Sequence, residues 1–216
     1  MKETFSKEIK MKICDFITCS DFPCLDTDKK SFLVPYAEMN PQDIRIIMIS
    51  EAPPAEKKDY FYAPDNPFYL QTTLQAFRDA GENISTVQEI LDLGIYLTTA
   101  IKCGKTQYAI STNTIKNCSE LLEKEVGLFP NLKVFLLMGD VAIRSMNYIW
   151  KRQTGSKIIP SGSTYKIRKQ KFHFEEKRVF PSYTQTGKNY LIEKSKRRMI
   201  AEDIKEAILI LGSSRF

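Results

Sequence analysis

Residues 44–54 read Ile-Arg-Ile-Ile-Met-Ile-Ser-Glu-Ala-Pro-Pro, and this stretch decides the fold class. The run from Ile44 to Ser50 is β-prone and almost continuously apolar, which is typical of a parallel strand that is buried on both faces. Pro53 and Pro54 end the strand because proline cannot donate to a β-ladder. Glu51 is therefore expected just beyond the carboxyl end of a central strand.

Three further β-prone segments follow this strand and alternate with segments of helical periodicity. The expected strands cover residues 94–101, 132–138 and 178–180, and the expected helices cover 69–80, 114–126, 139–150 and 192–212. Residues 157–178 are basic and β-prone, which favours a hairpin packed on the sheet edge. The alternation predicts a three-layer α/β/α sandwich with a central, mainly parallel four-stranded sheet.

The length and composition favour one domain. The 216 residues, 43% of them hydrophobic, suffice for one α/β core, so we expect a single domain over 1–216 with an irregular, cysteine-bearing segment at 1–40. No apolar run is long enough to cross a bilayer, and the first twelve residues lack the apolar middle of a signal peptide. We expect no membrane partner, a cytoplasmic location and a monomer.

Positive charge is concentrated in one part of the chain. Residues 151–200 carry 14 Lys or Arg against 3 Glu, a local excess of +11 within a net charge of +6. Clustered cations favour a nucleic-acid partner, because phosphate neutralisation needs positive charge in one place. A solvated, lysine-rich face is the structural alternative.

Ligands of open parallel sheets bind outside the carboxyl ends of the strands, which here are segments 50–54, 98–103, 139–140 and 181–187. Six short elements lie at or near these ends, at 46–54, 66–68, 96–103, 118–122, 136–142 and 180–184. In this order they resemble the motifs of the uracil-DNA glycosylase superfamily, most closely those of its iron–sulfur-containing branch.

The sequence departs from the family at positions that matter for chemistry. The final histidine of the family pattern falls at Thr184, and the asparagine of its second strand falls at Thr99. Ser50 and Pro54 stand where the family has glycines. The resemblance therefore implies the fold and a relation to DNA glycosylases, but not a pocket that reads uracil with an asparagine and a histidine.

The resemblance also implies roles for individual residues. Glycosylases flip a base out of the stack, hold it against an aromatic ring and break its bond to the sugar. Glu51 is the expected carboxylate that steadies the cationic sugar or positions water, and Tyr183 and Thr184 are expected hydroxyl donors. The expected base-binding residues are Ser50, Ala52, Pro53, Phe68 and Thr99. The structural alternatives are a turn carboxylate for Glu51, ordinary loop residues for Tyr183 and Thr184, and a core ring for Phe68.

The segment after the second motif is expected to contact DNA. In the family this loop pushes an apolar side chain into the duplex. Here Gly187 permits a sharp turn, Lys188 can meet a phosphate, and Tyr190 or Leu191 is the expected wedge. The alternative is that Tyr190 and Leu191 start the last helix and pack on the sheet. Further phosphate contacts are expected from Lys194, Lys196, Arg197 and Arg198.

Five cysteines stand at positions 14, 19, 24, 103 and 118. The resemblance implies that Cys103 and Cys118 are two ligands of a 4Fe-4S cluster, with Cys24 and Cys14 (or Cys19) as the other two. The local Cys-x-x-Cys spacing of that branch is missing, and reduced structural thiols are the alternative.

The sequence thus predicts a DNA glycosylase-like protein that hydrolyses the N-glycosidic bond of a flipped-out base, uracil or another damaged base, in base excision repair. Two alternatives remain open at this stage. One is a catalytically degenerate, nucleic-acid-binding member of the superfamily. The other is a nucleoside- or nucleotide-processing enzyme on the same fold, which would not need the basic 151–200 region.

Overall fold

A computed structural model describes residues 10–212 of the chain. Its centre is a five-stranded sheet in the order β5-β4-β7-β9-β8. The strands are β4 (Ile46–Ser50), β5 (Ile95–Thr99), β7 (Val134–Met138), β8 (Phe172–Phe174) and β9 (Lys177–Ser182). The first four strands in this order are parallel to their neighbours, and β8 pairs antiparallel with β9 at the edge.

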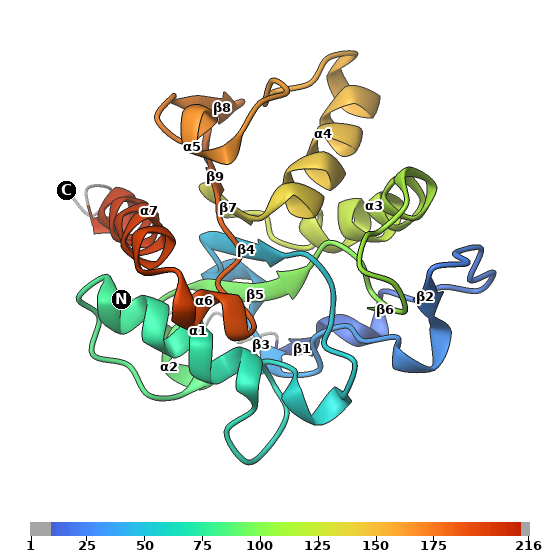
Figure 1. The fold of residues 1–216 in the computed structure, drawn as a ribbon, viewed down its shortest axis with the longest axis horizontal. Coiled ribbons are helices and arrows are strands. Elements are labelled where there is room, and N and C mark those ends of the chain that lie inside the picture. Colours follow the sequence, from blue (N-terminus) through green and yellow to red (C-terminus); the bar gives the residue numbers. More distant parts are fainter. Residues whose placement is uncertain (1–9, 213–216) are drawn as a thin grey trace, which may run out of the picture.

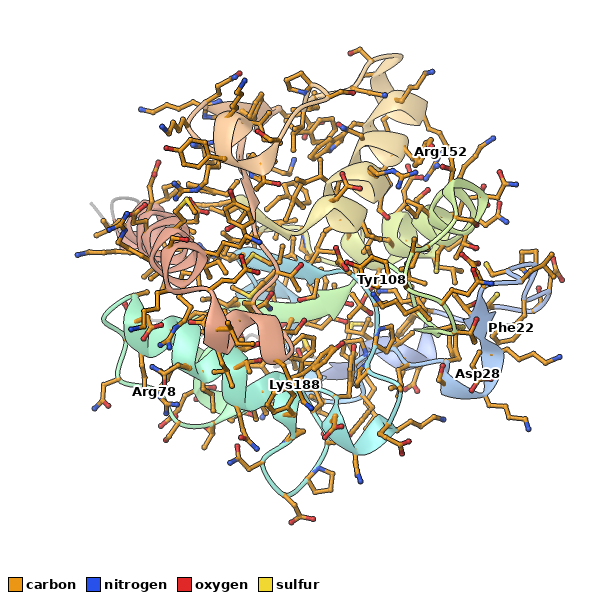
Figure 2. The ribbon with its side chains drawn as sticks, in the orientation of Figure 1. Phe22, Asp28, Arg78, Tyr108, Arg152 and Lys188 are labelled. Atoms are coloured by element: carbon orange, nitrogen blue, oxygen red, sulfur yellow. The ribbon has the colours of Figure 1, made fainter. Side chains whose placement is uncertain are left out.

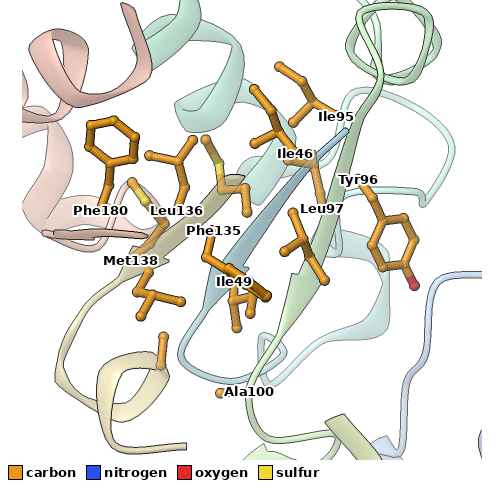
Figure 3. Close-up of a cluster of buried hydrophobic side chains, with 14 of the residues drawn as sticks. Ile46, Ile49, Ile95, Tyr96, Leu97, Ala100, Phe135, Leu136, Met138 and Phe180 are labelled. Carbon is orange, nitrogen blue, oxygen red and sulfur yellow. The ribbon is translucent and has the colours of Figure 1, made fainter. Parts of the chain in front are cut away.

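Three strands of the sheet account for the long apolar runs in the sequence. Every residue of β4, β5 and β7 is buried, because helices cover both faces of the sheet. Figure 3 shows Ile46, Leu97 and Leu136 from these strands within the core. Ser50 lies opposite Thr99 in the register, so β4 and β5 end at the same level and their following residues meet at one edge.

Helices form the outer two layers. On one side of the sheet lie α1 (Phe68–Asp79) and α7 (Lys194–Gly212), and on the other lie α3 (Thr112–Val126) and α4 (Asp140–Thr154), as Figure 1 shows. Three shorter helices are α2 (Val87–Asp92), α5 (Thr164–Ile167) and α6 (Lys188–Ile192). Each long helix turns an apolar face to the sheet, which is the packing that the sequence periodicity indicated.

The segment before β4 is held by short strands and turns. β1 (Met11–Lys12) pairs with β3 (Glu38–Met39), and β2 (Thr27–Asp28) pairs with β6 (Gly104–Lys105). Its helical turns are of the 3-10 type: η1 (Ile13–Asp15), η2 (Lys29–Ser31) and η3 (Pro41–Asp43), with η4 (Lys57–Asp59) after β4. The pairing of β2 with β6 ties the N-terminal segment to the chain that follows β5.

The predicted fold class is confirmed, with one correction to the sheet. All four predicted parallel strands are present. The hairpin expected over residues 157–178 is confined to β8 and β9, because residues 164–167 form α5 instead, and β8 joins the sheet and brings the count to five. Glu175 takes a positive φ of 53° in the hairpin turn. The last helix, expected over residues 192–212, is present as α7, and a short helix that was not predicted, α6, precedes it. In residues 10–212 no helix has the length and apolar character needed to span a membrane.

Candidate functional site

A cleft of about 520 Å³ opens at the carboxyl ends of the parallel strands. Its lining includes residues that follow β4, β7 and β9, among them Glu51, Ala52, Pro53, Gly139, Tyr183 and Thr184. Five of these six are residues that the sequence assigned to catalysis or base binding. The structure therefore brings most of the predicted site together at the edge where ligands of such sheets bind.

Glu51 is the carboxylate that follows β4 in this cleft, whose lining also includes Asp140 and Glu193. Burial raises its pKa, the nearby Asp140 carboxylate raises it further, and Lys105 and the backbone N–H of Val141 lower it in part. The net effect is a carboxyl group that ionises at higher pH than an exposed glutamate. A carboxylate that is poorly hydrated interacts strongly with a positive charge that develops beside it.

Gly139 allows Glu51 and Thr184 to approach each other. Gly139 has φ +109°, and a Cβ placed there would lie 2.8 Å from Glu51 Oε1 and closer still to Thr184 Oγ1. Both side chains thus converge over the glycine at the start of α4. Thr184 Oγ1 donates to the Met138 carbonyl at 3.2 Å, which fixes its position. Because Gly139 has no side chain, it permits the close approach of Glu51 and Thr184 as well as the turn.

Ser50 and Thr99 lie outside the cleft lining, although both are fully buried at the ends of their strands. Gln185 Nε2 donates to Ser50 Oγ at 2.9 Å, and Thr99 Oγ1 donates to the Ile101 carbonyl at 2.8 Å. Their hydroxyl groups are therefore occupied by internal hydrogen bonds. Gln185, which no sequence pattern singled out, connects the segment after β9 to the end of β4.

Tyr69, one residue after the expected Phe68, lines the cleft in its place. Tyr69 packs against Phe61 with ring centroids 5.6 Å apart, and burial raises the pKa of its phenol. Phe68 instead lines a separate groove of about 580 Å³, together with Leu191. Successive residues at the start of a helix point about 100° apart, so a shift of one position exchanges the two rings.

The lip of the cleft carries residues that the sequence did not single out. Lys105 is the last residue of β6, Tyr108 comes from the connection between β6 and α3, and Arg144 comes from α4. Figure 2 shows Tyr108 near the middle of the view, while Asp28 and Phe22 lie at the edge of the molecule. The Tyr108 side chain is 97% exposed. No sequence pattern marks such a residue, because exposure is set by the tertiary fold.

The expected wedge residues differ in their surroundings. Tyr190 is only 2% exposed, and its hydroxyl donates to Asp79 Oδ2 at 2.9 Å. Leu191 is 47% exposed and Ile192 is 73% exposed. Gly187 has φ +87°, as a sharp turn requires. The core position of Tyr190 matches the structural alternative for that residue, whereas Leu191 is free to contact a partner.

The basic residues on either side of the expected wedge also differ in their surroundings. Lys188, Lys194 and Arg198 are exposed. Arg197 donates hydrogen bonds to Asp79, among them two from Nη2 at 2.7 and 3.0 Å, so it joins α7 to α1. Lys196 pairs with Glu193 at 2.6 Å. Half of the cations of residues 151–200 make ion pairs, namely Arg152, Arg168, Lys177, Arg178, Lys196, Arg197 and Arg198.

A second cavity, of about 400 Å³, is lined by Cys19, Cys24, Cys103 and Cys118. Burial, and after it the neighbouring Cys118, Cys19 and Cys24 thiols, raise the pKa of Cys103 to about 12. Burial also raises the pKa of Cys118, to about 11. Cys14 lies elsewhere, with its thiol donating to Asp15 Oδ1 at 3.6 Å. Within the described residues, no three potential ligands stand in metal-binding geometry.

A fully buried ion pair joins the loop after β5 to helix α3. Lys102 Nζ pairs with Glu125 Oε2, and it also donates to Thr98 Oγ1 at 2.9 Å. Tyr96 and Thr98 donate to Glu125 Oε1 at 2.6 and 2.8 Å. The Lys102 backbone N–H donates to Cys118 Sγ at 3.2 Å, so this network reaches the cysteine cavity.

Comparison with known proteins gives one distant relative. The type-5 uracil-DNA glycosylase of Thermus thermophilus is 24% identical to the chain over 119 residues. The aligned part is 55% of this chain and 52% of that protein, so the chain spans about half the length of the relative that it matches. No family model matches. Together with the fold, this similarity supports a relation of the chain to the uracil-DNA glycosylase superfamily. It gives no support for the iron–sulfur branch in particular.

Proposed function

We propose that the chain is a DNA glycosylase that hydrolyses the N-glycosidic bond of a flipped-out base in base excision repair. The observation that carries the proposal is the convergence of Glu51 and Thr184 over Gly139, in a cleft at the carboxyl ends of the parallel strands. The distant similarity to a uracil-DNA glycosylase supports the same class of reaction. The volume of about 520 Å³ is ample for one nucleotide.

The chemistry follows from the charges of the transition state. As the N-glycosidic bond breaks, its electron pair leaves with the base and the sugar becomes cationic. The Glu51 carboxylate stabilises the cation and orients the water that adds to the sugar carbon. The water loses a proton as it adds to the sugar carbon, and the leaving base takes up a proton in turn. Tyr183 is the freer donor to that base, because its hydroxyl makes no hydrogen bond within residues 10–212, whereas Thr184 already donates to Met138.

The base itself is held by different side chains from those first expected. Tyr69, Ala52 and Pro53 line the cleft, so Tyr69 takes the stacking role that was expected of Phe68. Leu191, which is half exposed on α6, is the remaining wedge. An apolar side chain inserted into the duplex partly offsets the few kcal/mol that unstacking of a base costs.

The test is a base-release assay on oligonucleotides that carry uracil, hypoxanthine, xanthine or alkylated bases. Glu51→Gln is expected to lower the release rate by about 100-fold or more, the effect of removing one electrostatic stabiliser. The wild-type rate is expected to rise with pH through the raised pKa of Glu51, because only the ionised form stabilises the cation. Glu193→Gln is the matched control, since Glu193 also lines the cleft.

The assay separates the alternatives. Release of no base, with retained binding to oligonucleotides, would replace the proposal with a degenerate binding protein. Release from free nucleosides, with no salt-dependent binding to DNA, would indicate the nucleoside-processing alternative. A Glu51→Gln variant as active as the wild type would remove Glu51 from the mechanism.

We further propose that Cys19, Cys24, Cys103 and Cys118 hold a 4Fe-4S cluster. The donor set fits in kind and number, because four thiols line one cavity and such a cluster needs four thiolates; the thiols would have to move closer together to bind it. The same observation favours Cys19 over Cys14 as the fourth ligand. When bound, the cluster would link Cys19 and Cys24 of the N-terminal segment to Cys103, after β5, and to Cys118 on α3.

Iron and sulfide analysis of anaerobically purified protein tests the cluster. We expect brown protein with about four irons per chain. Serine at position 19, 24, 103 or 118 should lower the iron content sharply, whereas Cys14→Ser should leave it unchanged. Colourless, iron-free protein from iron-replete cells would exclude the cluster, and iron loss in Cys14→Ser would reassign the fourth ligand.

A further inference from the structure

An aromatic ring stands in solvent at the lip of the cleft. The Tyr108 side chain is 97% exposed, yet Tyr108 lines the same cleft as Glu51. Packing within the protein therefore gives no reason for a large ring at this position. Exposed aromatic rings beside a site are common where a partner stacks on them.

The loop that carries Tyr108 is anchored at both ends. Before the ring, β6 pairs with β2, and the Thr106 N–H donates to the Asp26 carbonyl at 3.0 Å. After the ring, the Ser111 N–H donates to Asp26 Oδ2 at 2.6 Å. A single residue, Asp26, thus holds both sides of the loop. The ring is presented by a fixed scaffold, which lowers the entropy lost when a ligand stacks on it.

A lysine side chain, that of Lys105, lies beside the Tyr108 ring. Lys105 Nζ donates to the Tyr108 carbonyl at 3.2 Å and lies 5.8 Å from the ring centroid. Lys105 makes no ion pair with a carboxylate in the described part of the chain. Across the cleft, Lys196 Nζ lies 5.4 Å from the ring of Tyr183, which also lines it. Cations that alternate with aromatic rings are the features with which proteins bind single-stranded nucleic acid.

We propose that Tyr108 stacks on an unpaired base next to the flipped one, with Lys105 on the adjoining phosphate, so that the preferred substrate is single-stranded or locally unpaired DNA. The inference rests on the proposed binding of DNA at this cleft. In a continuous duplex the neighbouring bases are stacked inside the helix, and their faces are not free for the ring. Unpaired neighbours present these faces without the cost of opening further pairs.

The experiment compares the affinities for a single-stranded oligonucleotide and for its duplex, both carrying one uracil with 2-aminopurine beside it. The wild type should bind the single strand more tightly and quench the 2-aminopurine fluorescence on stacking. Tyr108→Ala should lose about tenfold in affinity for the single strand, with little change for the duplex, and Tyr108→Phe should keep the wild-type affinity.

Tyr165→Ala is the matched control, because Tyr165 is also an exposed tyrosine with a lysine, Lys169, 4.4 Å from its ring centroid, and it does not line the cleft. Equal affinities of Tyr108→Ala and the wild type for the single strand would overturn the inference, as would equal losses for both substrates. The readout is binding, so base release measured in parallel distinguishes this failure from failure of the proposed reaction.

Discussion

Gly139 is the residue on which the geometry of the cleft depends most directly. Its φ of +109° lies in a region that side-chain-bearing residues rarely adopt, and the position of its absent Cβ is filled by Glu51 and Thr184. The same glycine begins α4, so a backbone shift there would also move the first turn of that helix. One small residue thus determines both the start of a helix and the approach of two functional side chains.

Gly139→Ala is expected to abolish base release and to lower the free energy of unfolding by about 1–3 kcal/mol, the cost of a side chain in a strained backbone conformation. Gly155→Ala is the control. Gly155 also has a positive φ, of +82°, but nothing lies within 4 Å of its absent Cβ. Urea denaturation should therefore show the smaller destabilisation in Gly155→Ala, where only the backbone is strained, and the release assay should show activity lost only at position 139. Activity retained in Gly139→Ala would contradict the assigned approach of Glu51 and Thr184.

Individual site residues were predictable where a strand end fixed them. Glu51, Ala52 and Pro53 follow a strand whose apolar run is unmistakable, and they do line the cleft. Phe68 and Tyr69 could not be distinguished, because a one-residue change in where a helix begins exchanges the rings that face the cleft. Tyr108 was not predictable, because its exposure depends on the distant Asp26.

At the scale of the secondary-structure elements, the fully buried pair of Lys102 and Glu125 joins the loop after β5 to α3. A buried charge is costly unless it is paired, and here both partners have hydrogen bonds as well as each other. The pair holds the end of β5 against α3, and the loop that leads to Lys105 and Tyr108 starts directly after it. The buried pair of Lys102 and Glu125 therefore fixes the point at which the loop to the lip begins.

Lys102→Met is expected to lower the free energy of unfolding by about 3–5 kcal/mol, because Glu125 is then left buried without its cation. For a chain of this size the melting temperature should fall by about 6–20 °C. The double variant Lys102→Met with Glu125→Leu should recover most of this loss, since no unpaired charge remains. A single variant as stable as the wild type would show that the pair does not stabilise the fold.

The long elements of the fold were predictable because their patterns are strong. Buried parallel strands such as β4 and β7 read as continuous apolar runs, and α3 repeats apolar residues at helical spacing. The edge strand β8 has only three residues and is half exposed, so its sequence does not reveal whether it joins the sheet or packs beside it. The pairing of β2 with β6 joins two segments far apart in sequence, and no local pattern predicts it.

At the scale of the whole molecule, the basic excess of residues 151–200 is partly neutralised by tertiary contacts. Arg168 pairs with Asp203 and Glu202, and Arg178 pairs with Glu206, so both cations serve the packing of α7. The sequence count therefore overstates the charge available to a partner. Lys188 and Lys194, near the cleft on α6 and α7, remain exposed.

Affinity for DNA is expected to fall steeply as salt concentration rises. Replacing Lys188 and Lys194 with glutamine should reduce the slope of log K against log salt by about 0.7–0.9 for each phosphate that is no longer neutralised. Lys177→Gln should leave the slope unchanged, because Lys177 is paired with Glu175. The measurement is a salt titration of binding by fluorescence anisotropy. An affinity that does not depend on salt would exclude a phosphate-binding surface.

Asp26 has a consequence for the order in which the protein assembles. It accepts hydrogen bonds from Thr106 and Ser111, residues that lie some eighty positions later in the chain. Contacts between such distant segments form late in folding, because closing a long loop costs entropy before the contact repays it. The lip with Tyr108 can therefore take its final shape only after the N-terminal segment has docked. During synthesis this docking has to wait until residues 106–111 have left the ribosome, so the lip cannot take shape while only the N-terminal segment has been made.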